Sequence, residues 1–280
     1  MDAKVRAFLA RLTFLAVAYA AFPAVAAIGA NPSILHPCRP KDINIEAKCG
    51  KYEVFENPSA RAGRKIPLNI VVLPALAPKP SEPVFWLSGG PGDAATSVLG
   101  AAKGGFLEPL RRDHDLVFVD QRGTGGSNGL YCDIGDDPRD VQTFFGEVFP
   151  QNSIVACRKT LERVANLRFY TTPIAMDDLD EVRGALGYGK INIVAASYGS
   201  LAAQVYMRQH ADHIRAVFLL GVATPAIKQP LLFAPAAQRA LDLLFKDCAA
   251  DKLCADNFPD SARNSTPSWR DFGTGRFMYG

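Results

Sequence analysis

The decisive stretch of the sequence is INIVAASYGS, residues 191–200. An apolar run that predicts a buried strand ends in small residues around Ser197, and a helical pattern follows to about His210. Where a strand turns sharply into a helix, the two backbones pass closely, so the residues two before and two after the serine must be small. Ala195 and Gly199 meet this requirement. The pattern predicts that the Ser197 hydroxyl is presented at the edge of a sheet as a nucleophile.

The helix that follows Ser197 also predicts how a developing negative charge is bound. The first backbone N–H groups of a helix have no partner within the helix and carry the positive end of its dipole. We therefore predict that the backbone N–H of Tyr198 is an oxyanion donor. The usual pattern around such a serine is G-x-S-x-G, and Ala195 replaces its first glycine here.

Two more glycine-rich turns follow apolar runs that predict strands. GGPG, residues 89–92, comes after VFWLS, and DQRGTGGS, residues 120–127, comes after DLVFVD. Because the carboxyl ends of parallel strands meet at one edge of a sheet, we expect both turns to lie beside Ser197. We predict that the backbone N–H of Gly90 is the second oxyanion donor, and that Asp120 and Arg122 order the neighbouring loops.

The glycine turns do not fit a nucleotide site. The run from Gly90 lacks the third glycine of a dinucleotide-binding loop, and the chain contains no GKS or GKT. The 280 residues carry a net charge of only +3, without a basic stripe interleaved with aromatic residues. We therefore expect no nucleic-acid partner and no cofactor.

The rest of the chain alternates short apolar strands with helices. The runs CGKYEVFEN and RKIPLNIVVLPA predict a hairpin, after an irregular segment over residues 28–48. Several strands are apolar on both faces, which predicts an α/β fold with a mostly parallel sheet and helices on both of its faces. Helices are expected over 93–112, 153–166, 172–187, 198–210 and 236–249, and Thr172 is expected to be the N-cap of the third.

The first residues are typical of an export signal. Lys4, Arg6 and Arg11 precede an apolar stretch from Leu12 to Phe22, and an A-x-A pattern closes at Ala26. The stretch is well short of the ~20 residues that a membrane-spanning helix needs. We expect residues 1–26 to be removed and the protein to be secreted or periplasmic, with no membrane contact after cleavage.

The six cysteines fit an exported protein. An even number of cysteines behind a signal peptide indicates disulfides, although six cysteines allow fifteen pairings. We favour pairs between sequence neighbours, because each bridge then closes one local excursion. No C-x-x-C motif occurs, so we expect no metal site. The favoured pairs are Cys38–Cys49, Cys132–Cys157 and Cys248–Cys254.

Taken together, GGPG, DQRGTG, a helix ending in ALG and the strand before SYGS resemble the α/β-hydrolase fold. More narrowly, they resemble the proline iminopeptidase and tripeptidyl aminopeptidase branch of serine peptidases, over roughly residues 50–255. DLLFKDCAADKLCADNFPD is similar to the start of the cap in secreted members. Ser88 stands where many relatives have histidine. The resemblance implies a core over 27–228 and the start of a cap over 229–259. Residues 260–280 have neither a helical nor a strand period and predict an irregular tail.

This resemblance also implies a triad in which an acid and then a histidine follow the serine in the chain. None of the four histidines fits the position of the base. His210 and His213 lie about 20 Å down the helix from Ser197, His114 lies at the opposite end of its strand, and nothing supports His36. We therefore expect a sheet that is incomplete at its C-terminal end, without its last strands and most of the cap. A complementing C-terminal chain is the partner that this interpretation implies.

The sequence thus favours an exported serine hydrolase that releases residues from peptide N-termini through an acyl-enzyme on Ser197. An esterase of the same fold, acting on small esters, is the neighbouring hypothesis. A catalytically inactive, truncated remnant without the triad acid and base is the alternative. A weaker third hypothesis is a binding module that uses the open crevice.

Overall fold

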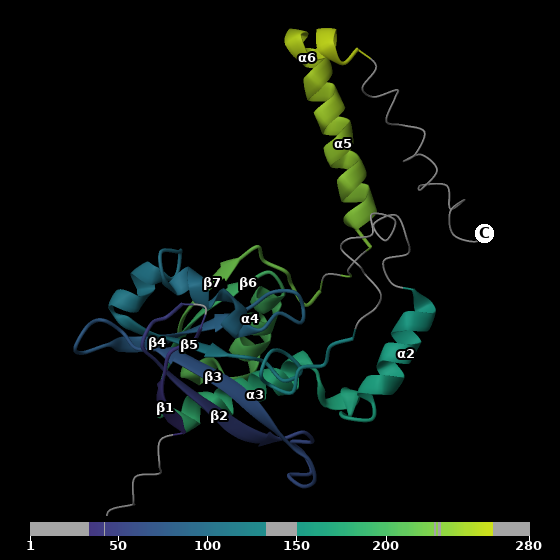
Figure 1. Cartoon of the computed structure of the whole chain (residues 1–280). Helices are drawn as coiled ribbons and strands as arrows, with labels where there is room; N and C mark the ends of the chain where they lie inside the picture. Colours follow the sequence, from purple (N-terminus) through teal and green to yellow (C-terminus); the bar gives the residue numbers. More distant parts are fainter. Residues whose placement is uncertain (1–33, 42, 133–149, 227, 229–230, 260–280) are drawn as a thin grey trace, which may run out of the picture.

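A computed structural model describes residues 34–41, 43–132, 150–226, 228 and 231–259. Its centre is one seven-stranded sheet in the order β1-β2-β3-β5-β4-β6-β7 (Figure 1). The first four strands in this order pair antiparallel, and β5, β4, β6 and β7 pair parallel. The strands are β1 Leu35–Cys38, β2 Ala47–Phe55, β3 Lys65–Leu73, β4 Ser81–Leu87, β5 His114–Val119, β6 Ile191–Ala196 and β7 Ile214–Leu220.

Helical segments cover both faces of this sheet. Alternate residues of β4 point to opposite faces, so Phe85 and Leu87 belong to one buried cluster and Trp86 to the other. The helices α3 (Thr172–Ala185) and α4 (Tyr198–Gln209) complete the first cluster, while η1 (Ala95–Ala102) completes the second. The remaining segments are η2 Glu108–Arg112, α2 Gln151–Leu161, η4 Leu167–Phe169, η5 Ala211–His213, α5 Phe233–Ala250 and α6 Lys252–Asn257. The expected α/β sheet with two covered faces is confirmed.

Three local expectations were wrong. Residues 93–112 form the two 3₁₀ segments η1 and η2 instead of one helix, because Gly104 and Gly105 lie between them and weaken a continuous helix. Thr171, with extended backbone, is the N-cap of α3, and Thr172 is its first helical residue. The segment 28–48 is not wholly irregular, since it contains β1, which pairs with β2.

The three disulfides between sequence neighbours are confirmed. Cys38–Cys49, Cys132–Cys157 and Cys248–Cys254 form with Cα–Cα distances of 5.8, 5.7 and 5.1 Å. The first joins β1 to β2, and the third joins the two helices α5 and α6. The expected signal segment 1–26 and the expected tail 260–280 lie outside the described residues.

The β7 side of the sheet is less buried than its centre. Every residue of β7 is exposed or half-buried, whereas β6 is largely buried. Phe218 on β7 is 60% exposed. The helix α5 extends away from the sheet and buries none of its residues (Figure 1). Among the described helices, none combines the length and the apolar character that crossing a bilayer requires.

The bridge between β1 and β2 gives a stability prediction. Replacing both Cys38 and Cys49 by alanine removes the disulfide that closes a loop between residues 11 positions apart in the unfolded chain. We expect a loss of about 2–3 kcal/mol in the free energy of unfolding, because the unfolded state gains conformational freedom. Urea unfolding followed by fluorescence measures it. The matched control replaces Cys248 and Cys254, which lie off the sheet, and should leave the sheet's unfolding midpoint in place. An unchanged midpoint in the first variant contradicts the prediction.

Candidate active site

The backbone at Ser197 adopts a conformation that few residues other than glycine take. Its φ is +53° and its ψ is −124°, between the end of β6 and the first residue of α4. Such conformations cost on the order of 1–3 kcal/mol and persist only where the surroundings enforce them. The Ser197 N–H donates to the carbonyl of Leu220 at 2.9 Å, which ties the turn to β7. Ser197 itself is exposed.

Close packing explains why this turn needs small residues. A side chain at Gly199 would collide with the carbonyl oxygen of Leu87, and its Cβ would stand 2.7 Å from the carbonyl oxygen of Ser88. Helix α4 therefore starts directly against the end of β4. Ala195 is fully buried, so the methyl group that replaces the usual glycine is accommodated inside the sheet.

Ser200, which the sequence analysis did not single out, fixes the same turn from inside. Its fully buried hydroxyl donates to the carbonyl of Ser197 at 2.6 Å and accepts from the N–H of Ala223 at 2.8 Å. It therefore connects the turn to the residues just after β7. The sequence offered only a serine three positions after Ser197, which by itself is a common helix residue.

The GGPG turn lies against the serine. A Cβ on Gly89 would stand 3.2 Å from Ser197 Cβ and 3.6 Å from Ser197 Oγ. Gly90 has a φ of +98°, which favours glycine. Below the turn, the buried Ser88 hydroxyl accepts from Trp86 Nε1 at 2.8 Å and donates to the carbonyl of Ala94 at 3.1 Å. The structure thus brings this turn and Ser197 together, and the roles of Gly90 and Tyr198 as oxyanion donors stay predictions.

Asp120 joins three segments around this edge. The side chain is fully buried and accepts hydrogen bonds from Thr96 N at 2.9 Å, Thr96 Oγ1 at 3.1 Å, Asn69 Nδ2 at 2.9 Å and Gly126 N at 3.0 Å. The carboxylate therefore holds η1, β3 and the 120–127 turn in one arrangement. These bonds consume its oxygen lone pairs, so Asp120 acts on structure here.

Arg122 is the second buried charge of the same turn. Its guanidinium donates to both carboxylate oxygens of Asp178 on α3, at 2.6 and 2.7 Å, and to the carbonyls of Glu56 and Phe169, both at 2.9 Å. Only 1% of the Arg122 side chain is exposed. Burial raises the pKa of Asp178, against the opposing effect of Arg122. The sequence could not identify the partner, because Asp177 and Asp180 are equally close in the chain.

All four histidines lie in the described residues and away from Ser197. His36 is on β1, at the far edge of the sheet, and His114 is at the start of β5, opposite the end where β6 meets Ser197. His210 is about 20 Å along the axis of α4 at 1.5 Å per residue, and His213 lies beyond it. The described hydrogen bonds and ion pairs join none of them to Ser197.

Two of these histidines belong to an ion network between α3 and the end of α4. His213 Nδ1 lies 2.7 Å and His210 Nδ1 3.7 Å from the carboxylate of Asp180, which also takes Arg183 Nε and the Tyr206 hydroxyl at 2.7 Å. Burial alone raises the pKa of Asp180, but the hydrogen bonds from Arg183, Tyr206 and His213 outweigh it and lower the pKa to about 2. Asp180, His210 and His213 lie close enough together to hold a metal ion. Hydrogen bonds from Arg183, Tyr206 and His213 already occupy the Asp180 carboxylate, however.

The buried Arg122–Asp178 pair predicts a large effect on stability. Replacing Arg122 by methionine leaves the Asp178 carboxylate buried without its partner. We expect a loss of about 3–5 kcal/mol in the free energy of unfolding, measured in urea. The control is Arg158→Met, which removes an exposed ion pair with Glu162 and should leave the urea midpoint nearly unchanged. Equal effects of the two substitutions contradict the structural role of Arg122.

The Asp180 network predicts a pH dependence. A carboxyl group whose pKa is lowered by folding stabilises the protein above its unfolded pKa, and this contribution is lost as the pH falls through its folded pKa. Asp180→Asn should therefore cost about 1 kcal/mol near neutral pH, allowing for solvent screening, and less as the pH falls from 4 towards 2. Urea midpoints of the unchanged protein and of Asp180→Asn, measured across this pH range, test the prediction. A difference between the two midpoints that grows as the pH falls contradicts it.

Comparison with known proteins agrees with this geometry. Residues 82–256 match the family described as alpha/beta hydrolase fold. Serine protease Hip1 of Mycobacterium tuberculosis is 28% identical over an alignment of 240 residues that covers 78% of this chain and 45% of that protein. Tripeptidyl aminopeptidases are 29% identical in Streptomyces coelicolor, over 49% of this chain and 28% of the relative, and 31% identical in Streptomyces lividans, over 40% and 23%. The chain spans less than half the length of these relatives. Since the family match covers more than half of the chain, the protein belongs to the α/β-hydrolase fold family.

Proposed function

We propose that the protein is an exported serine peptidase of the aminopeptidase type, with Ser197 as its nucleophile. The observation that carries this proposal is the strained, exposed turn at Ser197, with a glycine turn packed against its Cβ. A protein tolerates such a conformation where function requires it, because an ordinary turn at the same place would be more stable. The turn lies at the carboxyl edge of the parallel strands, the edge at which α/β proteins bind their ligands.

The chemistry follows from the groups around this serine. Ser197 Oγ attacks the carbonyl carbon of the scissile bond, and the amine leaves with a proton to give an acyl-enzyme that water then hydrolyses. The N–H groups of Tyr198 and Gly90 are the proposed donors to the oxyanion. Each such donor is typically worth about 3–4 kcal/mol of the barrier. Tyr198 is the first residue of α4, so the helix dipole adds to its effect.

The proposal requires a base and an orienting acid from polypeptide outside the described residues. None of the four histidines contacts Ser197. The relatives are more than twice as long as the part that matches, so their length leaves room for these groups. A further part of the same protein and a separate complementing chain are both sources that would fit.

The substrate class is argued from the relatives and from the sequence. The names of the matched proteins, a serine protease and tripeptidyl aminopeptidases, favour a peptide over a small ester. The motifs shared with proline iminopeptidases favour the same branch. The N-terminal pattern of residues 1–26 and three disulfides support export.

A non-catalytic protein of the same fold is the second candidate. The observation in its favour is that no histidine among the described contacts reaches Ser197. A serine without a base keeps its ordinary, weak nucleophilicity. The two candidates therefore differ in the reactivity of one hydroxyl group.

Labelling with a fluorophosphonate tests this reactivity. We expect Ser197 to be labelled in the protein that includes the polypeptide supplying the base, and Ser197→Ala to lose at least nine-tenths of the label, because the reagent phosphonylates only activated serines. The matched control is Ser97→Ala, an exposed serine on η1, which should label like the unchanged protein. The absence of labelling favours the non-catalytic protein.

A second assay separates aminopeptidase from esterase activity. A peptide anilide with a free N-terminus should be cleaved at least tenfold faster than its N-acetylated form, because an aminopeptidase binds the free amine. Faster cleavage of simple nitrophenyl esters than of either peptide, without a preference for the amine, would identify the esterase instead.

A further inference from the structure

The hydroxyl group of Ser200 is fully buried beside the proposed catalytic turn, and the mechanism above makes no use of it. It donates to the carbonyl oxygen of Ser197 at 2.6 Å, and the backbone N–H of Ser200 donates to the same oxygen at 2.9 Å. One residue therefore supplies two hydrogen bonds to the carbonyl group that follows the strained conformation at Ser197. Without this hydroxyl, only the backbone bond would remain.

The carbonyl of Ser197 belongs to the same peptide unit as the N–H of Tyr198, the proposed oxyanion donor. A peptide unit is planar and trans, so its C=O and N–H point in opposite directions and move together. Tyr198 is the first residue of α4, and its N–H therefore has no acceptor within the helix. Among the hydrogen bonds of the described residues, none starts at this N–H. Its direction is therefore set by the groups that hold the Ser197 carbonyl.

The hydroxyl of Ser200 is itself held in one orientation. It accepts from the N–H of Ala223 at 2.8 Å, so its own proton is directed to another acceptor. Two carbonyl oxygens lie within reach, that of Ser197 at 2.6 Å and that of Ala223 at 3.5 Å. Gln204 Nε2 donates to the Ala223 carbonyl at 2.7 Å. The shorter distance and this competing donor make the Ser197 carbonyl the acceptor of the Ser200 proton.

Both backbone polar groups of Ser197 are connected to the end of β7. Its N–H donates to the carbonyl of Leu220 at 2.9 Å, and its carbonyl is connected through the Ser200 hydroxyl to the N–H of Ala223. An unfavourable backbone conformation persists only where its surroundings enforce it. The Leu220 bond holds the peptide unit before Ser197, and Ser200 holds the one after it. Only the second of these units carries the N–H of Tyr198.

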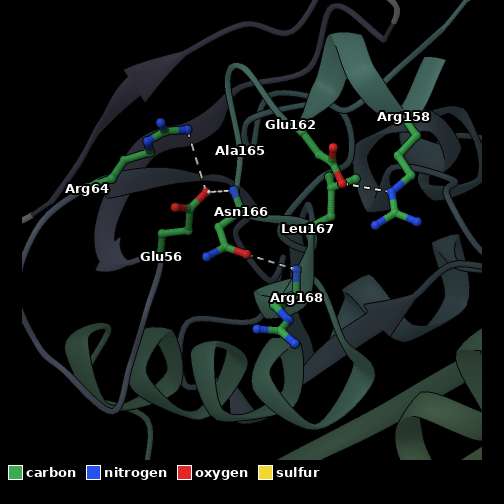
Figure 2. A pocket seen from close by; sticks show the side chains of 8 residues that line it. All are labelled: Glu56, Arg64, Arg158, Glu162, Ala165, Asn166, Leu167 and Arg168. Atoms are coloured by element: carbon green, nitrogen blue, oxygen red, sulfur yellow. Dashed lines mark hydrogen bonds and ion pairs between the residues drawn. The ribbon is translucent and has the colours of Figure 1, made fainter. Parts of the chain in front are cut away.

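The charged side chains near α2 do not orient this peptide unit. A charge could also act on a peptide dipole, and the cavity of about 690 Å³ shown in Figure 2 is lined by several charged residues. In this cavity Glu56 lies 3.7 Å from Arg64. Arg158 pairs with Glu162. The hydrogen bonds and ion pairs described for these side chains do not reach the turn, so the direction of the Tyr198 N–H depends on neutral hydrogen bonds.

We propose that Ser200 is a positioning residue for the reaction proposed above. Its hydroxyl holds the peptide unit between Ser197 and Tyr198, so that the Tyr198 N–H points to the place where the oxyanion forms. The catalytic meaning of this inference rests on the proposed function, whereas the orientation of the peptide unit is a property of this polypeptide. Two experiments test it, one on reactivity and one on structure.

The first experiment measures the rate of fluorophosphonate labelling at Ser197, in the protein that includes the polypeptide supplying the base. The phosphoryl oxygen gains negative charge as the Ser197 hydroxyl attacks and fluoride leaves, and a misdirected donor stabilises that charge less well. In Ser200→Ala we expect the maximal labelling rate to fall by about fivefold or more. The reagent concentration that gives half of this rate should change by less than about twofold, because the donor acts mainly in the transition state.

The matched control is Ser127→Ala. Ser127 is also fully buried, and its hydroxyl also donates to a backbone carbonyl, that of Asp120 at 2.6 Å, and accepts from a backbone N–H, that of Asn69 at 2.7 Å. The two alanine substitutions therefore remove the same kind of group and should lower the urea midpoint by similar amounts. Only Ser200→Ala should change the orientation of the Tyr198 N–H. Ser200→Thr, which keeps the hydroxyl, should restore the labelling rate.

The second experiment needs no reaction. The full chain is labelled with 15N-tyrosine, so that NMR reports the amide of Tyr198 among those of the eight tyrosines. We expect Ser200→Ala to add an exchange contribution to the relaxation dispersion of Tyr198, because its peptide unit then samples more than one orientation. The amide of Tyr206, on the same helix, should show no such change. The absence of this contribution in Ser200→Ala, or an equal contribution in Ser127→Ala, would overturn the proposal.

The outcomes separate this inference from the proposed function. If Ser197 is not labelled at all, the serine peptidase is rejected, and the relaxation of Tyr198 still decides whether Ser200 holds its peptide unit. If Ser197 is labelled but Ser200→Ala reacts at the rate of the unchanged protein, the hydrolase stands and the positioning role of Ser200 is wrong. If Ser200→Ala does not fold, Ser200→Cys takes its place in both experiments, because a thiol is a weaker donor of similar size.

Discussion

The contact between the start of α4 and the end of β4 is the constraint on which the site depends. Gly199 leaves no room for a side chain against the carbonyls of Leu87 and Ser88, so the helix can begin directly at the sheet. That closeness forces Ser197 into its unusual backbone conformation and keeps it exposed. The geometry is maintained by the buried sheet, whose strands β4 and β5 are covered on both faces.

The buried charges of Asp120 and Arg122 hold the surrounding loops in fixed positions relative to the sheet. Asp120 and Arg122 both follow directly after β5 in the chain, but their side chains bind partners in different directions. Asp120 binds the segments around η1 and β3, and Arg122 binds α3 and the end of β2. Because each is satisfied by several partners, neither is free to act on a substrate, and both fix the walls within which a substrate would lie.

Local pattern predicted the strands, the serine turn and the glycine turns, because apolar runs and small residues report directly on burial and close approach. The local pattern did not predict interactions between residues that are far apart in the chain. The Arg122–Asp178 pair joins residues 56 positions apart, and Leu35–Cys38 become a strand only through pairing with β2. Residues 93–112 looked helical by composition, but Gly104 and Gly105 weaken a helix enough for packing to decide. The roles of Gly90 and Tyr198 rest on the same local reasoning.

The buried hydroxyl of Ser200 has a consequence for the polypeptide that continues beyond β7. Together with Gln204 Nε2, which donates to the carbonyl of Ala223 at 2.7 Å, it anchors both polar backbone atoms of that residue to α4. The outgoing chain therefore leaves from a fixed point, which two side chains of α4 hold by hydrogen bonds next to the turn at Ser197. The polypeptide after Ala223 thus starts at a position that is set by the same helix that begins at this serine.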